Sequence, residues 1–227
     1  MDNTDKPTDR GNITRRALVE AALIEFASSG YYGTGQREIA RRAKVNQALI
    51  RYHFGNKEGL YLAVFRFICE QIQTYIGPGI DRIEAHLAVL PCDRELTNTE
   101  RKQCVLLALS LVEDMVRLFA SAQMSTSAQL IMREQHEPTT AFDILYEGFM
   151  KRSLDVVTTL VQRIRPTLSH QEASLSVAAI LGQTLVFRAA RSTLLRHLGW
   201  KDIGPSEFEV LIKQTRANVC ALLSTKE

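Results

Sequence analysis

The stretch GTGQREIARRAKVNQALIRYHFGNK, residues 33–57, decides the fold of the first part of this chain. Apolar residues recur at helical spacing over about residues 36–43 and again over 47–53, with a tight turn at Lys44 between them. Asn46 is a favourable N-cap for the second of these helices. Two short helices joined in this way and packed on a preceding helix form a helix-turn-helix. Its inward-facing positions are Ile39, Ala40, Ala43, Val45, Ile50 and Phe54.

Helical spacing continues through almost the whole chain, and almost no stretch alternates as a strand would. Gly30 is the expected end of the first helix, and Gly77-Pro78-Gly79 is the expected end of the long helix that follows the motif. We therefore expect an all-α protein with a small N-terminal three-helix domain and a larger C-terminal helical domain. The other helices are expected at about 14–28, 57–76, 80–90, 100–121, 127–134, 139–165, 169–198 and 206–223.

The composition is that of a globular protein: 45% of the 227 residues are hydrophobic, 23% are charged, and only 12 are Gly and 6 Pro. It excludes a disordered or collagen-like chain. No apolar segment opens the sequence as a signal peptide would, and the uncharged runs are shorter than the roughly 18 to 20 apolar residues of a membrane span. The four cysteines stand far apart without zinc-site spacing. We expect a cytoplasmic protein with reduced thiols and no metal, cofactor or membrane partner.

Positive charge is concentrated near the N-terminus. Residues 10–57 contain nine Lys and Arg but only three Glu, an excess of six, whereas the whole chain has a formal net charge of +3. A basic N-terminal segment followed by a neutral-to-acidic remainder of the chain is typical of a DNA-binding domain joined to a separate partner domain. The alternative is an ordinary solvated helix surface, but here the charge coincides with the helix-turn-helix spacing.

Several features of residues 14–60 occur together: Arg15, Ala21-Ala22, Phe26, Gly30, Gly33-Thr34, Arg37-Glu38-Ile39-Ala40, Ala43, His53-Phe54, Lys57-Glu58 and Leu60. In this combination the segment resembles the DNA-binding domain of TetR-type transcriptional regulators. The resemblance implies a helical C-terminal domain that binds a ligand and dimerises. Three positions depart from the family pattern: Gly35 replaces a frequent Thr, Lys44 the usual turn Gly, and Arg51 a common aromatic residue. At Lys44 this implies either a left-handed residue or a different turn.

A second set of features lies in the C-terminal half: Arg133-Glu134, Pro138-Thr139, Ala141-Phe142, Gly182-Gln183, Phe187-Arg188, Ala190-Arg191 and Leu198-Gly199-Trp200. These features resemble the CecR-type branch of the same family. We accordingly divide the chain into a flexible tail (1–12), a helix-turn-helix DNA-binding domain (13–57) and a helical ligand-binding and dimerisation domain (58–227).

The second helix of the motif is expected to lie in the major groove with its N-terminal half at the base edges. Gln47 can pair with adenine through two hydrogen bonds, and Arg51 can reach guanine or a phosphate. Ala48 allows close approach and can contact a thymine methyl group. Asn46, which starts the helix, belongs to the same predicted DNA-binding surface.

Phosphate contacts are expected around this helix. Tyr52, His53 and Lys57 are the expected backbone contacts, and Lys57 also lies at the start of a helix, whose amides favour an anion. The alternatives are packing against the first helix for Tyr52 and a hydrogen-bonded structural role for His53. The flanking phosphate contacts are expected from Thr34, Arg37 and Arg41.

One such domain reads only a few base pairs, so we expect a homodimer on an inverted repeat of double-stranded DNA. The expected dimer surface lies on the helices at about 139–165 and 169–198. The run ASLSVAAILG, residues 173–182, is rich in small residues, which let helices approach closely. The alternative is that this run packs within the core of one subunit.

A ligand-responsive regulator needs a second site, and a mostly apolar cavity with a few polar groups suits a small organic ligand. We expect the cavity between the long helix after the motif and the helices at about 100–121, 127–136 and 170–198. The alternative is that its apolar residues are plain core and that the two C-terminal arginines pair with Glu134 or Glu137. The expected lining is Phe65, Met115, Phe119, Met132, Phe142 and Phe187, with polar contacts from Arg133, His136, Gln183, Arg188 and Arg191.

The expected function is that of a repressor that binds operator DNA as a homodimer and responds to a small organic inducer. An enzyme is not expected, because Glu134 and His136 are two positions apart on a helix and do not face each other. The sequence also contains no nucleophile elbow, phosphate loop or HExxH motif. The alternative function is that of a helical architectural protein that binds DNA or RNA without responding to a ligand.

Overall fold

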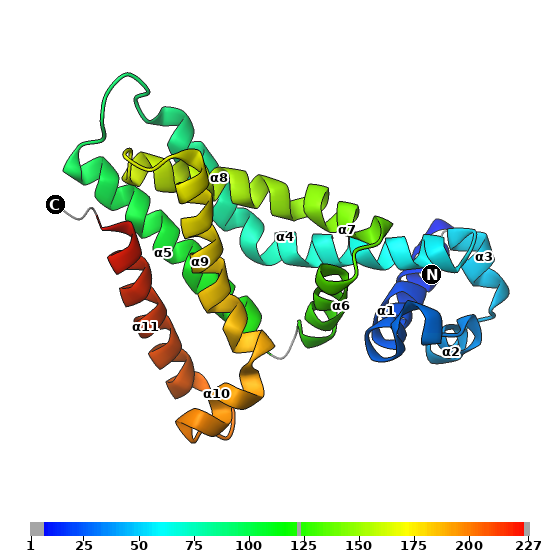
Figure 1. The fold of residues 1–227 in the computed structure, drawn as a ribbon. Helices are drawn as coiled ribbons and strands as arrows, with labels where there is room; N and C mark the ends of the chain where they lie inside the picture. Colours follow the sequence, from blue (N-terminus) through cyan, green and yellow to red (C-terminus); the bar gives the residue numbers. More distant parts are fainter. Residues whose placement is uncertain (1–6, 122–123, 225–227) are drawn as a thin grey trace, which may run out of the picture. The chain divides into compact units, whose positions relative to one another are not determined.

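The structure is a computed structural model that describes residues 7–121 and 124–224. All regular secondary structure in these residues is helical (Figure 1), which confirms the all-α prediction. The chain forms two compact units, and residues 58–71 and 126–148 pack with the helix-turn-helix rather than with the rest of the expected C-terminal domain. The first unit comprises Met1–Gln71 and Thr126–Gly148, and the second comprises Ile72–Ser125 and Phe149–Glu227.

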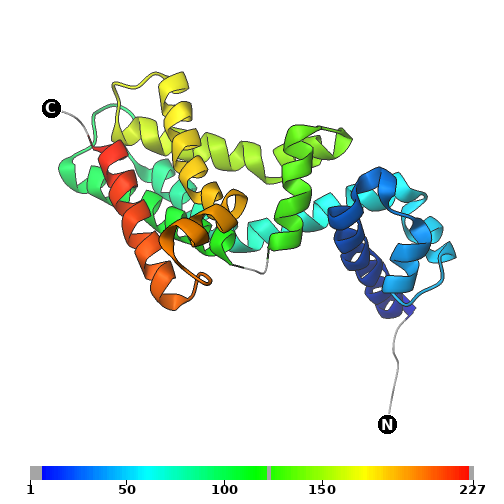
Figure 2. The ribbon, with the colours of Figure 1, turned by 60° about the horizontal axis from the view of Figure 1, so that its bottom comes forward.

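The first unit begins with the predicted helix-turn-helix domain, whose three helices are drawn in blue in Figure 2. Each helix contributes an apolar face to one core, in which Phe26, Ile39 and Ile50 are completely buried. This burial confirms the predicted inward-facing positions Ile39 and Ile50. The helices of the unit are α1 (Pro7–Gly33), α2 (Gln36–Arg42), α3 (Ala48–Phe54), the first part of α4 (Lys57–Val89), α6 (Ser125–His136) and α7 (Thr140–Leu145).

Helix α1 begins earlier than expected, and a kink interrupts it at Gly30, the residue at which its end was expected. Residues 7–12 of the expected flexible tail are helical, whereas residues 1–6 lie outside the described residues. At the expected stop, Gly30 has φ 71° and ψ 175°, and helical residues follow it to Gly33. The Thr34 hydroxyl donates to the carbonyl oxygens of Glu25 (3.0 Å) and Gly30 (2.7 Å). These shared hydrogen bonds close the C-terminal end of α1.

The turn of the helix-turn-helix contains a left-handed residue, which was one of the two alternatives. Lys44 has φ 57° and is the only non-glycine residue in the described chain with a positive φ. The Val45 N–H donates to the Ala40 carbonyl oxygen at 3.0 Å. Asn46 Oδ1 accepts a hydrogen bond from the Ala48 N–H at 2.8 Å, which caps the start of α3. The left-handed lysine carries conformational strain that a glycine would not.

The second unit contains the larger core, to which the later part of α4 contributes together with five further helices. These are α5 (Asn98–Ala120), α8 (Lys151–Ile164), α9 (His170–Ala189), α10 (Arg191–Leu198) and α11 (Pro205–Leu223). Helix α5 contacts α8, α9 and α11, and α8 packs on α9 (Figure 1). Capping boxes fix the starts of α5, through Thr97 and Glu100, and of α9, through Ser169 and Glu172.

Helix α4 contradicts the expected break at Gly77-Pro78-Gly79, because it continues through Pro78 and joins the two helices expected on either side. Packing in the second unit explains the continuity. Ile80 is 2% exposed and Ile83 is completely buried. A Cβ atom on Gly79 would lie only 2.9 Å from Leu111 Cδ1 of α5, so the glycine allows α5 to approach closely. Burial of this segment outweighs the backbone hydrogen bond that proline removes.

Two other expected helices are divided in the structure. The helix expected at 139–165 is interrupted by a π-helix, Tyr146–Met150, which separates α7 from α8. Close packing accompanies this π-helix, because a Cβ atom on Gly148 would lie 2.9 Å from Cys69 Sγ of α4. The helix expected at 169–198 bends by 79° between α9 and α10. The bend occurs at Ala190, whose φ of −116° and ψ of 27° are not helical.

No single described helix is long and apolar enough to cross a membrane. Helices α9 and α10 reach the necessary length and hydropathy only when they are taken together as a bent pair. All four cysteines are free. Cys69 and Cys104 are buried, and burial raises the pKa of the Cys69 thiol to about 11. Cys92 and Cys220 are exposed.

Replacing Lys44 with glycine is expected to stabilise the protein by about 1 kcal/mol, because the relief of left-handed strain exceeds the added entropy of the unfolded chain. For a chain of this size that is a rise in Tm of about 2–4 °C. Lys44→Ala removes the same charge but keeps the strain, so it serves as the matched control. Equal Tm values for the two variants in thermal melts would contradict the assignment of strain to this turn.

Candidate functional site

Helix α3 presents its predicted base-reading residues to solvent. Gln47, Ala48 and Arg51 are exposed, whereas Ile50 is completely buried in the core of the domain. One side of this short helix is therefore anchored, and the side that carries these residues is free. A recognition helix that enters the major groove needs this division.

Tyr52 and His53 lie in the second half of α3. The Tyr52 side chain is 81% exposed, so it does not pack against α1, which was the alternative to a phosphate contact. The half-buried His53 ring meets the Tyr52 ring edge-on, with the ring centroids 4.9 Å apart. This arrangement leaves the tyrosine hydroxyl, a hydrogen-bond donor, at the protein surface.

The motif carries cations that the protein does not neutralise. Arg42 pairs with Glu25 at 2.7 Å, and Arg16 pairs with Glu20 at 2.9 Å, so two of its arginines have carboxylate partners. The remaining exposed cations of residues 13–57, which form no ion pair with any described residue, are Arg15, Arg37, Arg41, Lys44 and Arg51. Unpaired cations around an exposed helix suit a polyanionic backbone.

Two of the predicted phosphate-binding side chains have partners inside the domain. Thr34 is 4% exposed and its hydroxyl closes α1, so this side chain is not available for the phosphate contact expected of it. Lys57 is half-buried, and its Nζ lies 4.7 Å from the centroid of the Tyr31 ring, a cation–π contact. Asn46 is exposed, but its side-chain oxygen caps α3.

A buried carboxylate links the N-terminal helices to α6 and α7 within the first unit. Glu134 is 2% exposed and accepts a hydrogen bond from the Tyr61 hydroxyl at 2.8 Å. It also accepts hydrogen bonds from the Thr139 backbone N–H (2.9 Å) and hydroxyl (3.0 Å). Thr139 in turn accepts from the Ala141 N–H and caps α7. Sequence reasoning missed this role, although Glu134 and Thr139 both belong to the features that resemble the CecR-type branch.

Tyr61 is also the centre of an aromatic cluster. Its ring contacts those of Phe26, Tyr31 and Phe65, with centroid distances of 4.9, 5.0 and 5.0 Å. Burial and the hydrogen bond to Glu134 raise the pKa of Tyr61, so its hydroxyl remains a donor at neutral pH. Phe65 is completely buried in this cluster, which makes it a core residue rather than the expected lining of a ligand cavity.

The other predicted ligand residues of the first unit lie on α6 and α7. Met132 and Phe142 are half-buried, and the Phe142 ring stacks on that of Tyr146 with centroids 6.3 Å apart. Arg133 is exposed and lies against Gly30 of α1, because a Cβ atom on that glycine would be 2.6 Å from Arg133 Nη1. His136 is exposed.

The predicted ligand residues of the second unit lie on α5, α9 and α10. Phe187 is 9% exposed and belongs to the core of this unit. Arg188 donates to the Ser121 carbonyl oxygen, while Arg191 pairs with Asp202, so neither arginine forms the ion pair with Glu134 or Glu137 that was the alternative to a ligand contact. The half-buried members of the set are Met115, Phe119 and Gln183.

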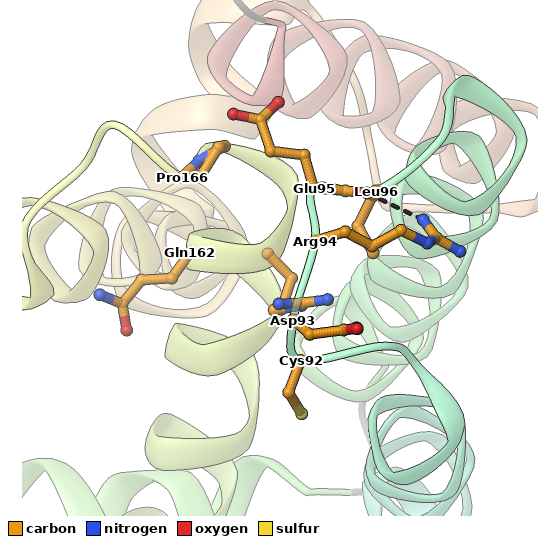
Figure 3. A pocket seen from close by; sticks show the side chains of 8 residues that line it. Cys92, Asp93, Arg94, Glu95, Leu96, Gln162 and Pro166 are labelled. Carbon is orange, nitrogen blue, oxygen red and sulfur yellow. Dashed lines mark hydrogen bonds between the residues drawn. The ribbon is translucent and has the colours of Figure 1, made fainter.

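A cavity of about 300 Å³ lies elsewhere in the second unit, between the loop before α5 and the end of α8 (Figure 3). The two arginines of its lining have partners: Arg94 binds both carboxylate oxygens of Glu100, at 2.8 and 2.9 Å, and Arg163 donates to the Pro91 carbonyl oxygen. None of the predicted ligand residues lines this cavity. In the described part of the chain no three His, Cys, Asp or Glu residues gather as metal ligands.

Comparisons with known proteins agree with these features. Residues 18–64 match the family described as "Bacterial regulatory proteins, tetR family", and residues 108–224 match "HTH-type transcriptional dual regulator CecR, C-terminal domain". The chain is 29% identical over 214 residues to the HTH-type transcriptional dual regulator CecR of Shigella flexneri, with 94% of this chain and 92% of that protein covered.

Two solved structures share the fold at low sequence identity. AibR in complex with isovaleryl coenzyme A and operator DNA has a TM-score of 0.63 and 15% identity, covering 92% of this chain and 98% of that one. FadR from Bacillus subtilis in complex with stearoyl-CoA has a TM-score of 0.58 and 15% identity, covering 93% and 99% of the two chains.

Glu134→Ala is expected to destabilise the protein by about 2–4 kcal/mol, because it leaves the buried Tyr61 hydroxyl without an acceptor and removes both hydrogen bonds from Thr139 at the start of α7. Tyr61→Phe removes only one of these hydrogen bonds and should cost about 1 kcal/mol. Glu137→Ala, at an exposed position near the end of the same helix, is the control and should lie within about 0.5 kcal/mol of wild type. Urea unfolding measures all three, and a Glu134→Ala value close to that of the control would refute the linking role.

Proposed function

Because the chain belongs to the TetR family of bacterial regulatory proteins, with a C-terminal half of the CecR type, it is a transcriptional regulator, and we propose that it acts as a ligand-responsive repressor. In this proposal it works in the cytoplasm as a homodimer on an inverted-repeat operator. Residues 13–57 contact the DNA, and residues 58–227 bind the ligand and form the dimer.

The observation that carries the proposal is the exposed face of α3. Gln47 and Arg51 supply base-specific hydrogen bonds, with Ala48 between them allowing close approach. The exposed cations around the helix supply the sequence-independent part of the affinity. The proposed phosphate contacts are Arg37, Arg41, Tyr52, His53 and Lys57.

The homodimer is supported by the two faces of α9. Ala173, Val177 and Ile180 are buried in the core of the subunit, so part of the small-residue run does pack internally. The opposite side of the run is exposed, and a Cβ atom on Gly182 would meet nothing within 4 Å. The exposed residues of this apolar stripe are Leu175, Ala178, Ala179, Gly182 and Val186. An apolar stripe with a 3–4-residue repeat suits close packing against a second copy.

The ligand acts by shifting populations in this proposal. The dimer has one conformation whose recognition helices match half-sites about 34–36 Å apart and another whose spacing does not. A ligand that prefers the second conformation lowers operator affinity by its differential affinity for the two. AibR and FadR carry acyl-coenzyme A molecules in their crystal structures, so acyl-coenzyme A esters are the first compounds to test. The proposed ligand contacts are Met115, Phe119, Met132, Arg133, His136, Phe142, Gln183, Arg188 and Arg191.

Selection of random duplex DNA on the purified protein is expected to recover one inverted repeat, because a homodimer presents two identical recognition helices. The selection is made at about 150 mM salt, since binding and its sequence specificity depend on salt. Gln47→Ala and Arg51→Ala should each lower discrimination at one position of that repeat by about 1–3 kcal/mol. Lys57→Ala should weaken all sequences alike.

Arg66→Gln, at an exposed position on α4 outside the motif, is the matched control for a lost positive charge. An unchanged preferred site in both Gln47→Ala and Arg51→Ala would refute their role in base readout. Recovery of no sequence from a folded, ligand-free dimer would favour the architectural alternative.

Ala178→Glu is expected to raise the dimer dissociation constant about a hundredfold or more, because each copy would bury a charge in the apolar stripe. Thr193→Glu adds the same charge at an exposed position on α10 and should leave the dimer intact. Sedimentation equilibrium measures both. Equal dissociation constants for the two variants would place the dimer surface away from this side of α9.

A further inference from the structure

The bend between α9 and α10 brings two arginines to the C-terminal end of α5. Arg188 precedes the bend at Ala190, and Arg191 follows it directly. Arg188 Nη2 donates to the Ser121 carbonyl oxygen, and Arg191 Nη1 donates to the Ala120 carbonyl oxygen at 2.9 Å. Both guanidinium groups therefore cap a helix end, where free carbonyl groups favour positive charge.

Helix capping leaves part of the hydrogen-bonding capacity of Arg188 unused. A guanidinium group has five N–H donors in one plane. The Nε of Arg188 is buried and has no acceptor in the described residues, and no described carboxylate forms an ion pair with this side chain. Burial first, and the charge of Arg191 second, lower the pKa of Arg188. The surroundings therefore desolvate a cation without supplying its counter-charge.

Arg191 does have a counter-charge, but a solvent-exposed one. Its Nη2 pairs with Asp202, whose side chain is 78% exposed, while the side chain of Arg191 is 25% exposed. The Ile203 N–H and then Arg191 lower the pKa of Asp202, so this carboxylate is ionised at neutral pH. Exposed ion pairs contribute little and exchange readily with other anions. Two guanidinium groups and one carboxylate leave a net positive charge at this end of α5.

We propose that Arg188 and Arg191 together bind one oxoanion, a carboxylate or phosphate group, and that the effector of this regulator carries that group. The inference rests on the proposed function, in which both arginines belong to the ligand site. The Nε–H and a neighbouring terminal N–H of a guanidinium point the same way and match the two oxygens of such an anion. Binding supplies the acceptor and the counter-charge that Arg188 lacks.

The test uses inorganic phosphate and acetate as probes, with NaCl at matched ionic strength as the reference, and follows the thermal unfolding of the full chain. At about ten times its dissociation constant, a bound anion should raise the Tm of the wild type by about 3–5 °C. Phosphate as the stronger probe indicates a phosphate-bearing effector, and acetate as the stronger probe indicates a carboxylate.

Arg188→Gln should lose this shift, whereas the matched control Arg196→Gln, an exposed arginine of α10, should keep it. Asp202→Asn removes the competing carboxylate and should enlarge the shift at a given anion concentration, and it tests the site even if Arg188→Gln does not fold. The proposal is overturned if neither anion raises the Tm of the wild type, if all variants respond equally, or if Asp202→Asn gives no larger shift.

The outcomes separate this inference from the proposed function on which it rests. Recovery of an operator together with no anion-dependent shift overturns the oxoanion site alone. The opposite outcome is an anion-dependent rise in Tm that needs Arg188, in a protein that selects no DNA sequence. That result overturns the regulatory function but keeps the anion site.

Discussion

The hydrogen bond from the Tyr61 hydroxyl to the Glu134 carboxylate joins residues 73 positions apart in the chain. Tyr61 lies in the aromatic cluster with Phe26 of α1, while Glu134 also receives both hydrogen bonds from Thr139 at the start of α7. A carboxylate as deeply buried as this one persists only when its oxygens are satisfied. The packing of the helix-turn-helix therefore depends on residues far outside the motif, and the first unit includes residues 126–148 for the same reason.

The parts of the fold that follow local rules could be predicted from the sequence. The helix-turn-helix is an example, because its buried positions Ile39 and Ile50 and the capping residue Asn46 all lie within one stretch of twelve residues. The continuity of α4 through Pro78 could not be predicted in this way. It depends on the approach of α5 at Gly79, a tertiary contact that outweighs the local preference of Gly and Pro for a break. The bend at Ala190 could not be predicted either, because no proline or glycine lies at that position. Arg188 and Arg191, on either side of the bend, donate to carbonyl groups at the end of α5.

The same distinction applies to the candidate site. The exposed side of α3 follows in part from helical spacing, because placing Ile50 in the core turns Ala48 and Arg51 outward. Gln47 is exposed because it lies at the start of the helix. The lining of a ligand cavity could not be predicted from spacing, because apolar side chains recur at the same helical spacing in a core and in a pocket. Phe65 shows the difference: only the positions of Tyr61 and its neighbours reveal that this ring is enclosed.

The π-helix at Tyr146–Met150 lies where the chain passes from the first compact unit to the second. Eleven positions separate Leu145 from Val156, which is close to three turns at 3.6 residues per turn, so an uninterrupted α-helix would line up these two buried residues. A π-helical turn holds more residues and shifts that alignment. Leu145 of α7 is buried in the first unit and Val156 of α8 in the core of the second, although one unbroken run of helical residues carries both. A segment whose hydrophobic period suggests a single straight helix can in this way serve two separate cores.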